Sequence, residues 1–257
     1  MTTTTSPPAP AAHESHHGTF PRILFAFNAV VAWIGVGVST VSSGLGLYRY
    51  DVTDPNMFQP SGSSLGRLLN SYSYFTMWSN VTVAIVMTIL AIAPHRGRVF
   101  RVFRLDALLM ITVTGIIYWG LLASGNNSQG IDVIGNVFNH SITPVVTVVV
   151  WLLVGPRNWI RWWTPLAALG LPIAWAAYTM VRGALISQYP YPFLNVVKYG
   201  LSSVLVTIVM IAIFGLVIGY LYYGLDLLLS GKARRSAAAT GTAAATEPAA
   251  PLEQATP

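Results

Sequence analysis

Two groups of polar residues lie within stretches of the chain that are otherwise apolar. The first is the motif YFTMWSN, which places Thr76, Ser79 and Asn80 together among aromatic residues. The second is NVFNHSITP, which contains His140. A hydroxyl is a weak nucleophile unless a base lies beside it, and a neutral imidazole can accept its proton. If Thr76 and His140 meet in the fold, these residue types predict nucleophilic acyl-transfer chemistry.

The composition indicates a membrane protein. Of the 257 residues, 54% are hydrophobic and only 9% are charged, whereas soluble domains carry about 25% charged residues. Apolar blocks of about 20 residues predict membrane-spanning helices rather than barrel strands, which are half as long and alternate in polarity. We therefore expect an all-α bundle of six transmembrane helices. The expected spans are 22–46, 71–93, 105–124, 137–154, 165–186 and 198–229.

The positions of lysine and arginine predict the orientation of the bundle. With the N-terminus inside, the inner segments carry ten of these residues and the outer segments four, namely Arg49, Arg67, Arg182 and Lys198. The positive-inside rule then places both termini in the cytoplasm. The net charge of +6 is accounted for by the flanks of the spans, so it does not require a nucleic-acid partner.

The two ends of the chain differ in composition from its middle. We expect disordered tails at 1–21 and 230–257, on either side of a six-helix domain at 22–229, because Thr-, Pro- and Ala-rich tracts bury too little apolar surface to fold. The N-terminal HESHH cluster lacks the second shell of a metal site. The chain contains no cysteine, which excludes disulfides and thiolate ligands. We expect no metal and no cofactor.

The polar residues of the second and fourth spans each follow helical spacing, so each set shares one face. These sets are Tyr72, Thr76, Ser79, Asn80 and Val83, and Asn136, Asn139, His140, Thr143 and Thr147. Both spans enter from the outer side, which puts Thr76 about 8 Å and His140 about 6 Å below the interface at 1.5 Å per residue. The two side chains can therefore meet if their helices are neighbours. Available types for stabilising an oxyanion are Tyr72, Ser79, Asn80, Asn136 and Asn139.

Each of these residues also has a purely structural interpretation. Thr, Ser and Asn in membrane helices commonly hydrogen-bond between helices, at about 0.6 kcal/mol each. Pro144 has no N–H for the carbonyl of His140 and predicts a loosened or kinked helix there, although prolines are common in membrane helices. The remaining aromatics are expected in the interface belt. They are Tyr48, Trp78, Trp119, Tyr189 and Tyr191.

Three segments, SYFTMWSN, NVFNHSITPVV and YPYPFLNVVKYG, resemble the androgen-induced-protein family of six-span membrane proteins. That family includes the androgen-dependent tissue-factor-pathway-inhibitor regulator and bacterial relatives, and the likeness covers residues 22–229. The resemblance implies that Thr76 is the nucleophile and His140 its partner in hydrolysing fatty-acid esters of hydroxy fatty acids. It places this chain in the bacterial branch. In the animal pattern asparagine directly follows tryptophan, whereas here Ser79 stands between Trp78 and Asn80.

The leading hypothesis is an intramembrane lipid-ester hydrolase of the cell membrane, whose substrate enters laterally from the outer leaflet. We expect a pocket formed by the second to sixth spans, with Tyr178, Arg182 and Lys198 near its outer mouth. The two cations would pair with a fatty-acid carboxylate or anchor the spans at the interface.

The alternative is a non-enzymatic protein that binds or senses lipids in the same pocket. A transporter is disfavoured because charges at the centres of the spans and a visible inverted repeat are lacking. A bis-histidine haem protein is disfavoured because the spans hold one histidine, His140. The sequence gives no indication of the oligomeric state.

Overall fold

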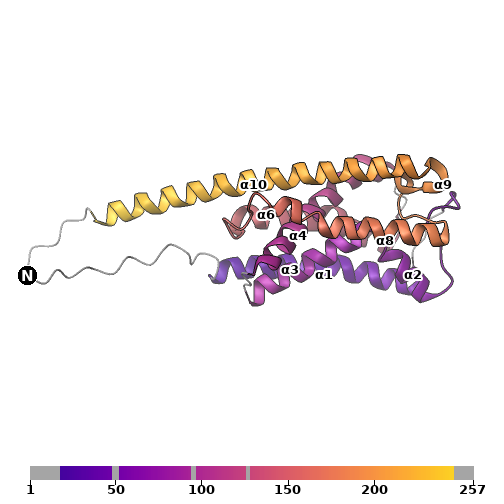
Figure 1. The fold of residues 1–257 in the computed structure, drawn as a ribbon. Coiled ribbons are helices and arrows are strands. Elements are labelled where there is room, and N and C mark those ends of the chain that lie inside the picture. The colour runs from indigo at the N-terminus through magenta and orange to yellow at the C-terminus, as the bar shows by residue number, and fades with distance from the viewer. Residues whose placement is uncertain (1–17, 48–51, 94–96, 126–127, 246–257) are drawn as a thin grey trace, which may run out of the picture.

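The computed structural model describes residues 18–47, 52–93, 97–125 and 128–245, and for 232–245 it describes the backbone alone. This part of the chain is an all-α bundle without strands, and six of its helices are long and apolar enough to cross a membrane (Figure 1). The expected fold class is therefore confirmed. The six spans are Thr19–Leu45, Phe75–Ile92, Arg98–Gly125, Ile131–Val154, Thr164–Ile186 and Leu201–Gly231.

Several spans are assembled from shorter helical elements. The long helices are α1 (Thr19–Leu45), α3 (Phe75–Ile92), α4 (Arg98–Ile117), α6 (Thr143–Val154), α8 (Gly170–Ile186) and α10 (Leu201–Ala245). The short ones are α2 (Ser64–Ser71), α5 (Ile131–Val137), α7 (Thr164–Ala167) and α9 (Val196–Tyr199). Two π-helical turns, η1 (Tyr118–Leu122) and η3 (Phe138–Ile142), and two 3₁₀ turns, η2 (Ala123–Gly125) and η4 (Pro192–Leu194), complete the set.

The π-helical turn η3 lies where the sequence predicts a loosened helix. It ends one residue before Thr143, and Pro144 follows in the first turn of α6. Because proline has no N–H, the carbonyl of His140 cannot receive the usual amide four residues later. The resulting irregularity is a π-turn, a feature that is frequent at functional sites. The expected loosening beside His140 is thus confirmed.

Besides the fourth span, which begins at Ile131 rather than 137, helix boundaries differ clearly from the expected ones at three places. The second span starts at Phe75 rather than 71, because Tyr74 is extended (φ −74°, ψ 139°) and the separate helix α2 precedes it. Tyr72 therefore ends α2 and does not share a helix with Thr76. The third span starts at Arg98, because arginine is a good helix former and its charge can extend into water.

The third difference concerns the two ends of the chain. Helix α10 continues to Ala245, into the segment expected to be disordered from 230. Its last part is rich in alanine, the strongest helix former. At the other end α1 starts at Thr19, within the expected tail 1–21. Residues 1–17, including the HESHH cluster, and 246–257 lie outside the described part.

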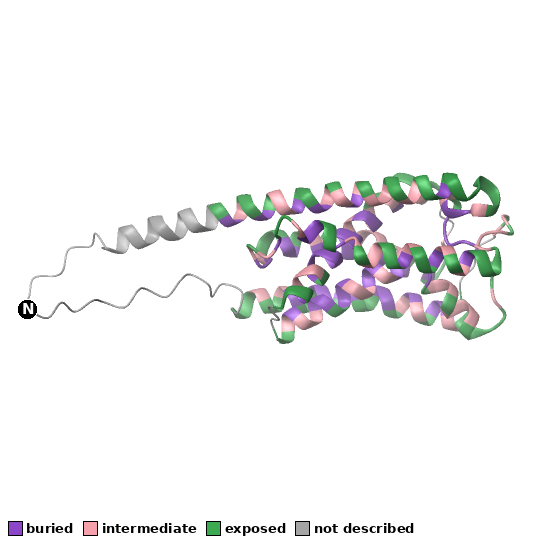
Figure 2. Cartoon of the chain, in the orientation of Figure 1, coloured by how far each residue is buried: buried purple, intermediate pink, exposed green. Residues whose placement is uncertain are grey.

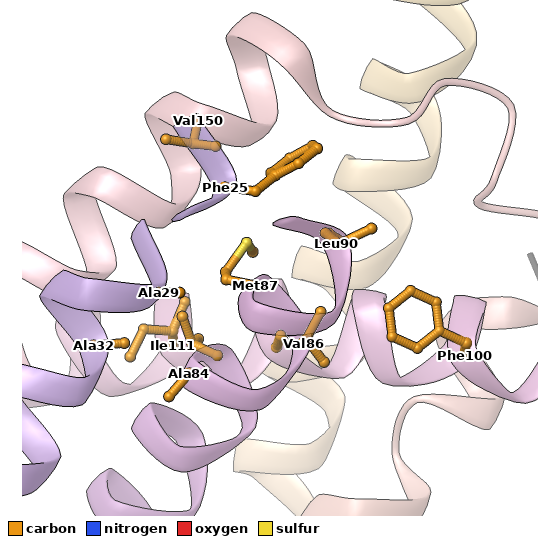
Figure 3. Close-up of a cluster of buried hydrophobic side chains, with 12 residues drawn as sticks. Phe25, Ala29, Ala32, Ala84, Val86, Met87, Leu90, Phe100, Ile111 and Val150 are labelled. Carbon is orange, nitrogen blue, oxygen red and sulfur yellow. The ribbon is translucent and has the colours of Figure 1, made fainter. Parts of the chain in front are cut away.

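The best-packed part of the bundle consists of α1, α3, α4 and α6. Their buried side chains form one cluster, which Figure 3 shows around Met87, with Phe25, Leu90, Ile111 and Val150 among its members. Helices α8 and α10 lie outside these four and bury only a small part of their length (Figure 2). Since lipid is as apolar as leucine, such a surface suits a membrane environment.

A folded cap closes the end of the bundle opposite to the start of α1. Two connections meet there through a single bridge between Met57 and Tyr189. The amide of Tyr189 donates to the carbonyl of Asn56 (2.8 Å), and the amide of Phe58 donates to the carbonyl of Tyr189 (3.2 Å). Phe58 is only 2% exposed. The long polar connection after α1 is therefore packed against the segment that precedes α9.

The orientation can be tested because the chain has no native cysteine. Gln129 and Gly18 are both exposed and lie at opposite ends of the bundle. We expect Gln129→Cys to react with an impermeant maleimide in intact cells, since the positive-inside rule places it outside. Gly18→Cys is the matched control and should react only after permeabilisation. The reverse pattern would show that the bundle is inverted.

Candidate functional site

The structure brings Thr76 and His140 into contact. Thr76 is the second residue of α3, and His140 projects from the π-helical turn η3. The hydroxyl oxygen of Thr76 lies 3.0 Å from Nε2 of His140, which is a hydrogen-bond distance. The expected meeting of the two side chains is therefore confirmed, and their catalytic role stays a prediction.

The contact of the second ring nitrogen, Nδ1, determines which nitrogen of His140 carries the proton. Nδ1 lies 3.2 Å from the backbone carbonyl of Asn136. A carbonyl accepts only, so Nδ1 holds the proton of the neutral ring and Nε2 keeps a lone pair. That lone pair faces the Thr76 hydroxyl. The arrangement matches the one required for a base that removes the proton of a nucleophile.

An aromatic ring fixes the plane of the imidazole. Tyr118, the first residue of the π-helical turn η1, stacks on His140 with centroids 3.9 Å apart and an interplanar angle of 19°. Gly115, one turn earlier, lies against Pro144: a methyl group placed on it would come within 3.2 Å of the proline ring. The third and fourth spans therefore approach closely where both are π-helical, and His140 is held between backbone and ring.

Tyr191 is a third member of the site, and the sequence analysis missed it. Its hydroxyl lies 3.4 Å from the hydroxyl of Thr76 and accepts the backbone N–H of Thr76 at 3.4 Å. Because it already accepts a proton there, its own hydrogen is available for donation. Burial raises the pKa of Tyr191 above its ordinary value, which keeps that hydrogen in place at neutral pH.

The interface-belt interpretation of Tyr189 and Tyr191 is wrong. The two side chains are 2% and 7% exposed, because the cap folds their segment inward. Tyr191 stacks on Phe193 at 5.2 Å and packs edge-on against Tyr74 at 5.4 Å. The aromatic and proline content of YPYPF was visible in the sequence, but its distance of 115 residues from Thr76 concealed the contact.

Ser79 and Asn80 hold the backbone of Thr76 rather than its hydroxyl. The Ser79 hydroxyl and the Asn80 amide donate to the carbonyl of Thr76, at 2.9 and 2.8 Å. Ser79 also pairs with Thr114 of α4 at 2.8 Å. Asn80 donates further to the carbonyl of Asn139 at 3.2 Å. These two residues therefore join the second span to the third and fourth.

Asn139 links this network to α1, which the sequence analysis did not foresee. Its amide donates to the hydroxyl of Ser39 at 2.8 Å and to the carbonyl of Gly35 at 3.4 Å. The side-chain oxygens of Asn139 and Asn80 are buried without a partner among the described residues. Asn139, next to His140 in the chain, thus positions η3 against α1.

The other predicted site residues lie elsewhere. Their contacts are Tyr72 with Thr40 (2.8 Å), the amide of Asn136 with Ser128 (3.4 Å), Tyr178 with Ser73 (2.8 Å), Arg182 with Asn70 (2.6 Å), and Lys198 over the ring of Tyr199 (5.4 Å). Arg182 also lies 4.4 Å from the ring centroid of Phe58, beneath the cap. None of these five side chains lines the cavity beside Thr76, so the expected placement of Tyr178, Arg182 and Lys198 at its mouth is not observed.

A cavity of about 450 Å³ adjoins Thr76 and His140, within the size range of small-molecule sites. The second to sixth spans all contribute to its wall, as expected from the sequence. Apart from the Thr76, Thr114, His140, Tyr118 and Tyr191 side chains the wall is apolar. Examples are Phe75, Val113, Leu169, Met180, Leu205 and Ile211.

Comparison of the chain with protein-family models, with curated proteins and with solved structures found no significant match. The fold and the site nevertheless define a class. The chain is a multi-pass α-helical membrane protein with a hydroxyl–imidazole pair at the wall of an apolar cavity.

The close packing of α1 on η3 gives a test of how the site is held. A methyl group on Gly35 would overlap the Asn139 side chain and lie 3.1 Å from Cβ of Phe138. We expect Gly35→Ala to lower the free energy of unfolding by about 1–3 kcal/mol, as overpacking does. Gly37→Ala is the matched control, because a methyl group there meets nothing within 4 Å. Thermal unfolding in detergent measures both, and equal stabilities would contradict the packing described here.

Proposed function

We propose that the chain is an intramembrane hydrolase of lipid esters, with Thr76 as nucleophile and His140 as general base. The observation that carries the proposal is the 3.0 Å contact between the Thr76 hydroxyl and Nε2 of His140, at the wall of an apolar cavity. A threonine used only for helix packing would not need an imidazole lone pair. The substrate class is esters of long-chain acids, with fatty-acid esters of hydroxy fatty acids as the specific candidate.

The proposed reaction has two balanced steps. The Thr76 oxygen attacks the ester carbonyl while its proton passes to Nε2 of His140. The bond from the carbonyl carbon to the alkoxy oxygen breaks, the proton goes to the leaving alcohol, and an acyl-Thr76 ester remains. Water then attacks this ester, again losing a proton to Nε2. The proton returns to the Thr76 oxygen as the carboxylic acid leaves.

Two features support stabilisation of the oxyanion. The Tyr191 hydroxyl lies beside the nucleophile with its hydrogen available, and a preorganised donor of this kind is usually a large contribution to catalysis. Thr76 lies in the first turn of α3, where the helix dipole favours negative charge. Ser79, Asn80 and Asn139 act by positioning the backbone, not as oxyanion donors.

The family of the chain and its location in the cell are also proposed here. The motifs around Thr76, His140 and Tyr191 resemble the androgen-induced-protein family, and the geometry of the first two agrees with the roles which that resemblance implies. We propose the cell membrane as the site of action, with the cap on the outer face. No cofactor or metal takes part in the proposed chemistry.

A non-enzymatic lipid-binding role is the second candidate, favoured by the almost wholly apolar cavity wall. Such a wall suits an acyl chain whether or not chemistry follows. In that case the Thr76–His140 pair would hydrogen-bond the polar end of a bound lipid. Reactivity of the hydroxyl separates the two candidates.

A fluorophosphonate probe tests the nucleophile. We expect the detergent-purified protein to be labelled covalently, because Nε2 activates the Thr76 hydroxyl. Thr76→Ala should abolish labelling, and His140→Ala should reduce it by about 10²-fold or more. The readout is the fraction of protein labelled over time.

Two variants make this test specific. Thr82→Ala is the matched control, because Thr82 lies on the same helix and its hydroxyl bonds only the carbonyl of Trp78, at 2.7 Å. It should label like the wild type, and Thr76→Ser should retain labelling. Labelling that survives Thr76→Ala would refute the nucleophile, and an unreactive wild type would favour the binding role.

The contribution of Tyr191 can be measured by removing one oxygen. We expect Tyr191→Phe to lower kcat for a lipid ester by about 10²-fold with little change in KM, because the donor acts mainly on the oxyanion. Tyr189→Phe is the control, since that residue is equally buried but does not line the cavity. Equal losses in both variants would assign the effect to packing.

A further inference from the structure

Three arginines gather at the end of the bundle opposite to Thr76. Arg101 and Arg104 come from the first turns of α4, and Arg157 comes from the connection between α6 and α7. Arg104 is only 4% exposed. All three of its guanidinium nitrogens are buried and have no hydrogen-bond partner among the described residues. A guanidinium has five donors and stays charged, so this degree of burial requires an acceptor.

The side chain of Arg104 points into a small recess. The recess has a volume of about 10 Å³ and is also lined by Arg101, Trp151, Trp159 and Ile160. Arg101 lies over the ring of Trp159, with 5.6 Å from Cζ to the centroid, and Arg157 lies over Trp151 at 5.1 Å. The two outer guanidinium groups are thus held against indole rings at the rim.

The nearby acidic groups do not satisfy Arg104. Oδ2 of Asp226 on α10 accepts the amide of Ile160 at 3.3 Å, and its Oδ1 has no hydrogen-bond partner among the described residues. Asp226 is close enough to act on Arg104 and Arg157 through its charge. Asp106 is two residues further along α4, about 200° around the helix, and so faces away. Asp226 is therefore one carboxylate near two cations, Arg104 and Arg157, and no hydrogen bond between it and Arg104 is formed among the described residues.

We propose that this arginine cluster binds a phosphate group, with one oxygen entering the recess to meet Arg104 and the rest held at the rim by Arg101. The recess has room for one oxygen-sized group only, which requires an anion whose remainder lies outside. Arginine matches phosphate geometry through paired N–H donors. The cluster lies at the end of a membrane span, where lipid headgroups bring phosphate, and inorganic phosphate offers the same chemistry.

The test uses the full-length protein in neutral detergent. Thermal unfolding is followed while dihexanoyl phosphatidic acid is added, and separately with dihexanoylglycerol and with inorganic phosphate against chloride at equal ionic strength. We expect the melting temperature to rise saturably with the phospholipid and not with dihexanoylglycerol, because only a ligand of the folded state stabilises it. A rise with inorganic phosphate alone would support the site and identify free phosphate as its source.

Matched variants test whether the binding of phosphate depends on Arg104. Arg104→Gln should weaken the apparent Kd at least about tenfold, the loss expected for one charge-assisted hydrogen bond. Arg98→Gln removes the same charge from an exposed position on the same helix and should leave the Kd unchanged. Asp226→Asn keeps an oxygen for the Ile160 amide and removes the competing charge, so it should tighten binding. This variant also keeps the proposal testable if Arg104→Gln does not fold.

Two results would overturn the proposal. One is an equal response of wild type and Arg104→Gln to phosphate-bearing ligands. The other is no response of the wild type to any phosphate-bearing ligand. Destabilisation by Asp226→Asn would then show that Arg104 is satisfied by Asp226 instead. Neither result bears on Thr76, because the two sites lie at opposite ends of the bundle.

Discussion

The structure depends on one constraint: in a hydrocarbon medium every backbone polar group must find its partner inside the protein. The constraint forces the backbone into helices and directs the polar side chains of α3 and η3 toward each other. Thr76 then accepts a hydrogen bond at its carbonyl and donates through its amide and its hydroxyl. The candidate site is thus built from the same groups that join the spans. The hydrogen bonds that pack the helices together also position Thr76 and His140.

The two halves of the bundle contribute differently to that network. The hydrogen bonds that orient Thr76 and His140 come from α1, α3, α4, α5 and η3, together with Tyr191 of the cap. Helices α8 and α10 supply mainly apolar wall and face outward (Figure 2). The hydrogen bonds that hold Thr76 and His140 therefore come from elements other than α8 and α10.

The sequence was sufficient to predict those features of the fold that depend on residues close together in the chain. Six apolar blocks and the faces that carry Thr76 and His140 follow from spacing, and the loosened turn follows from the missing N–H of Pro144. The structure agrees with these, except that Tyr72 belongs to α2 and not to the helix of Thr76. Tyr191 was not predicted, because its position depends on a cap formed by two distant connections. The role of Gly35 was missed for a similar reason: only the packed structure shows that Asn139 requires a residue without a side chain there. The start of α4 was misplaced because its arginines look like a loop when hydrophobicity alone is considered.

The clamped imidazole has a consequence for the movement of protons. Nδ1 of His140 is engaged with the carbonyl of Asn136, and one face of the ring is covered by Tyr118. Among the described contacts, Nε2 is then the one atom through which this ring can both gain and lose a proton. A proton taken up at this nitrogen must leave through the same nitrogen. Although His140 lies within a membrane span, the described contacts make its ring a dead end for protons rather than a relay.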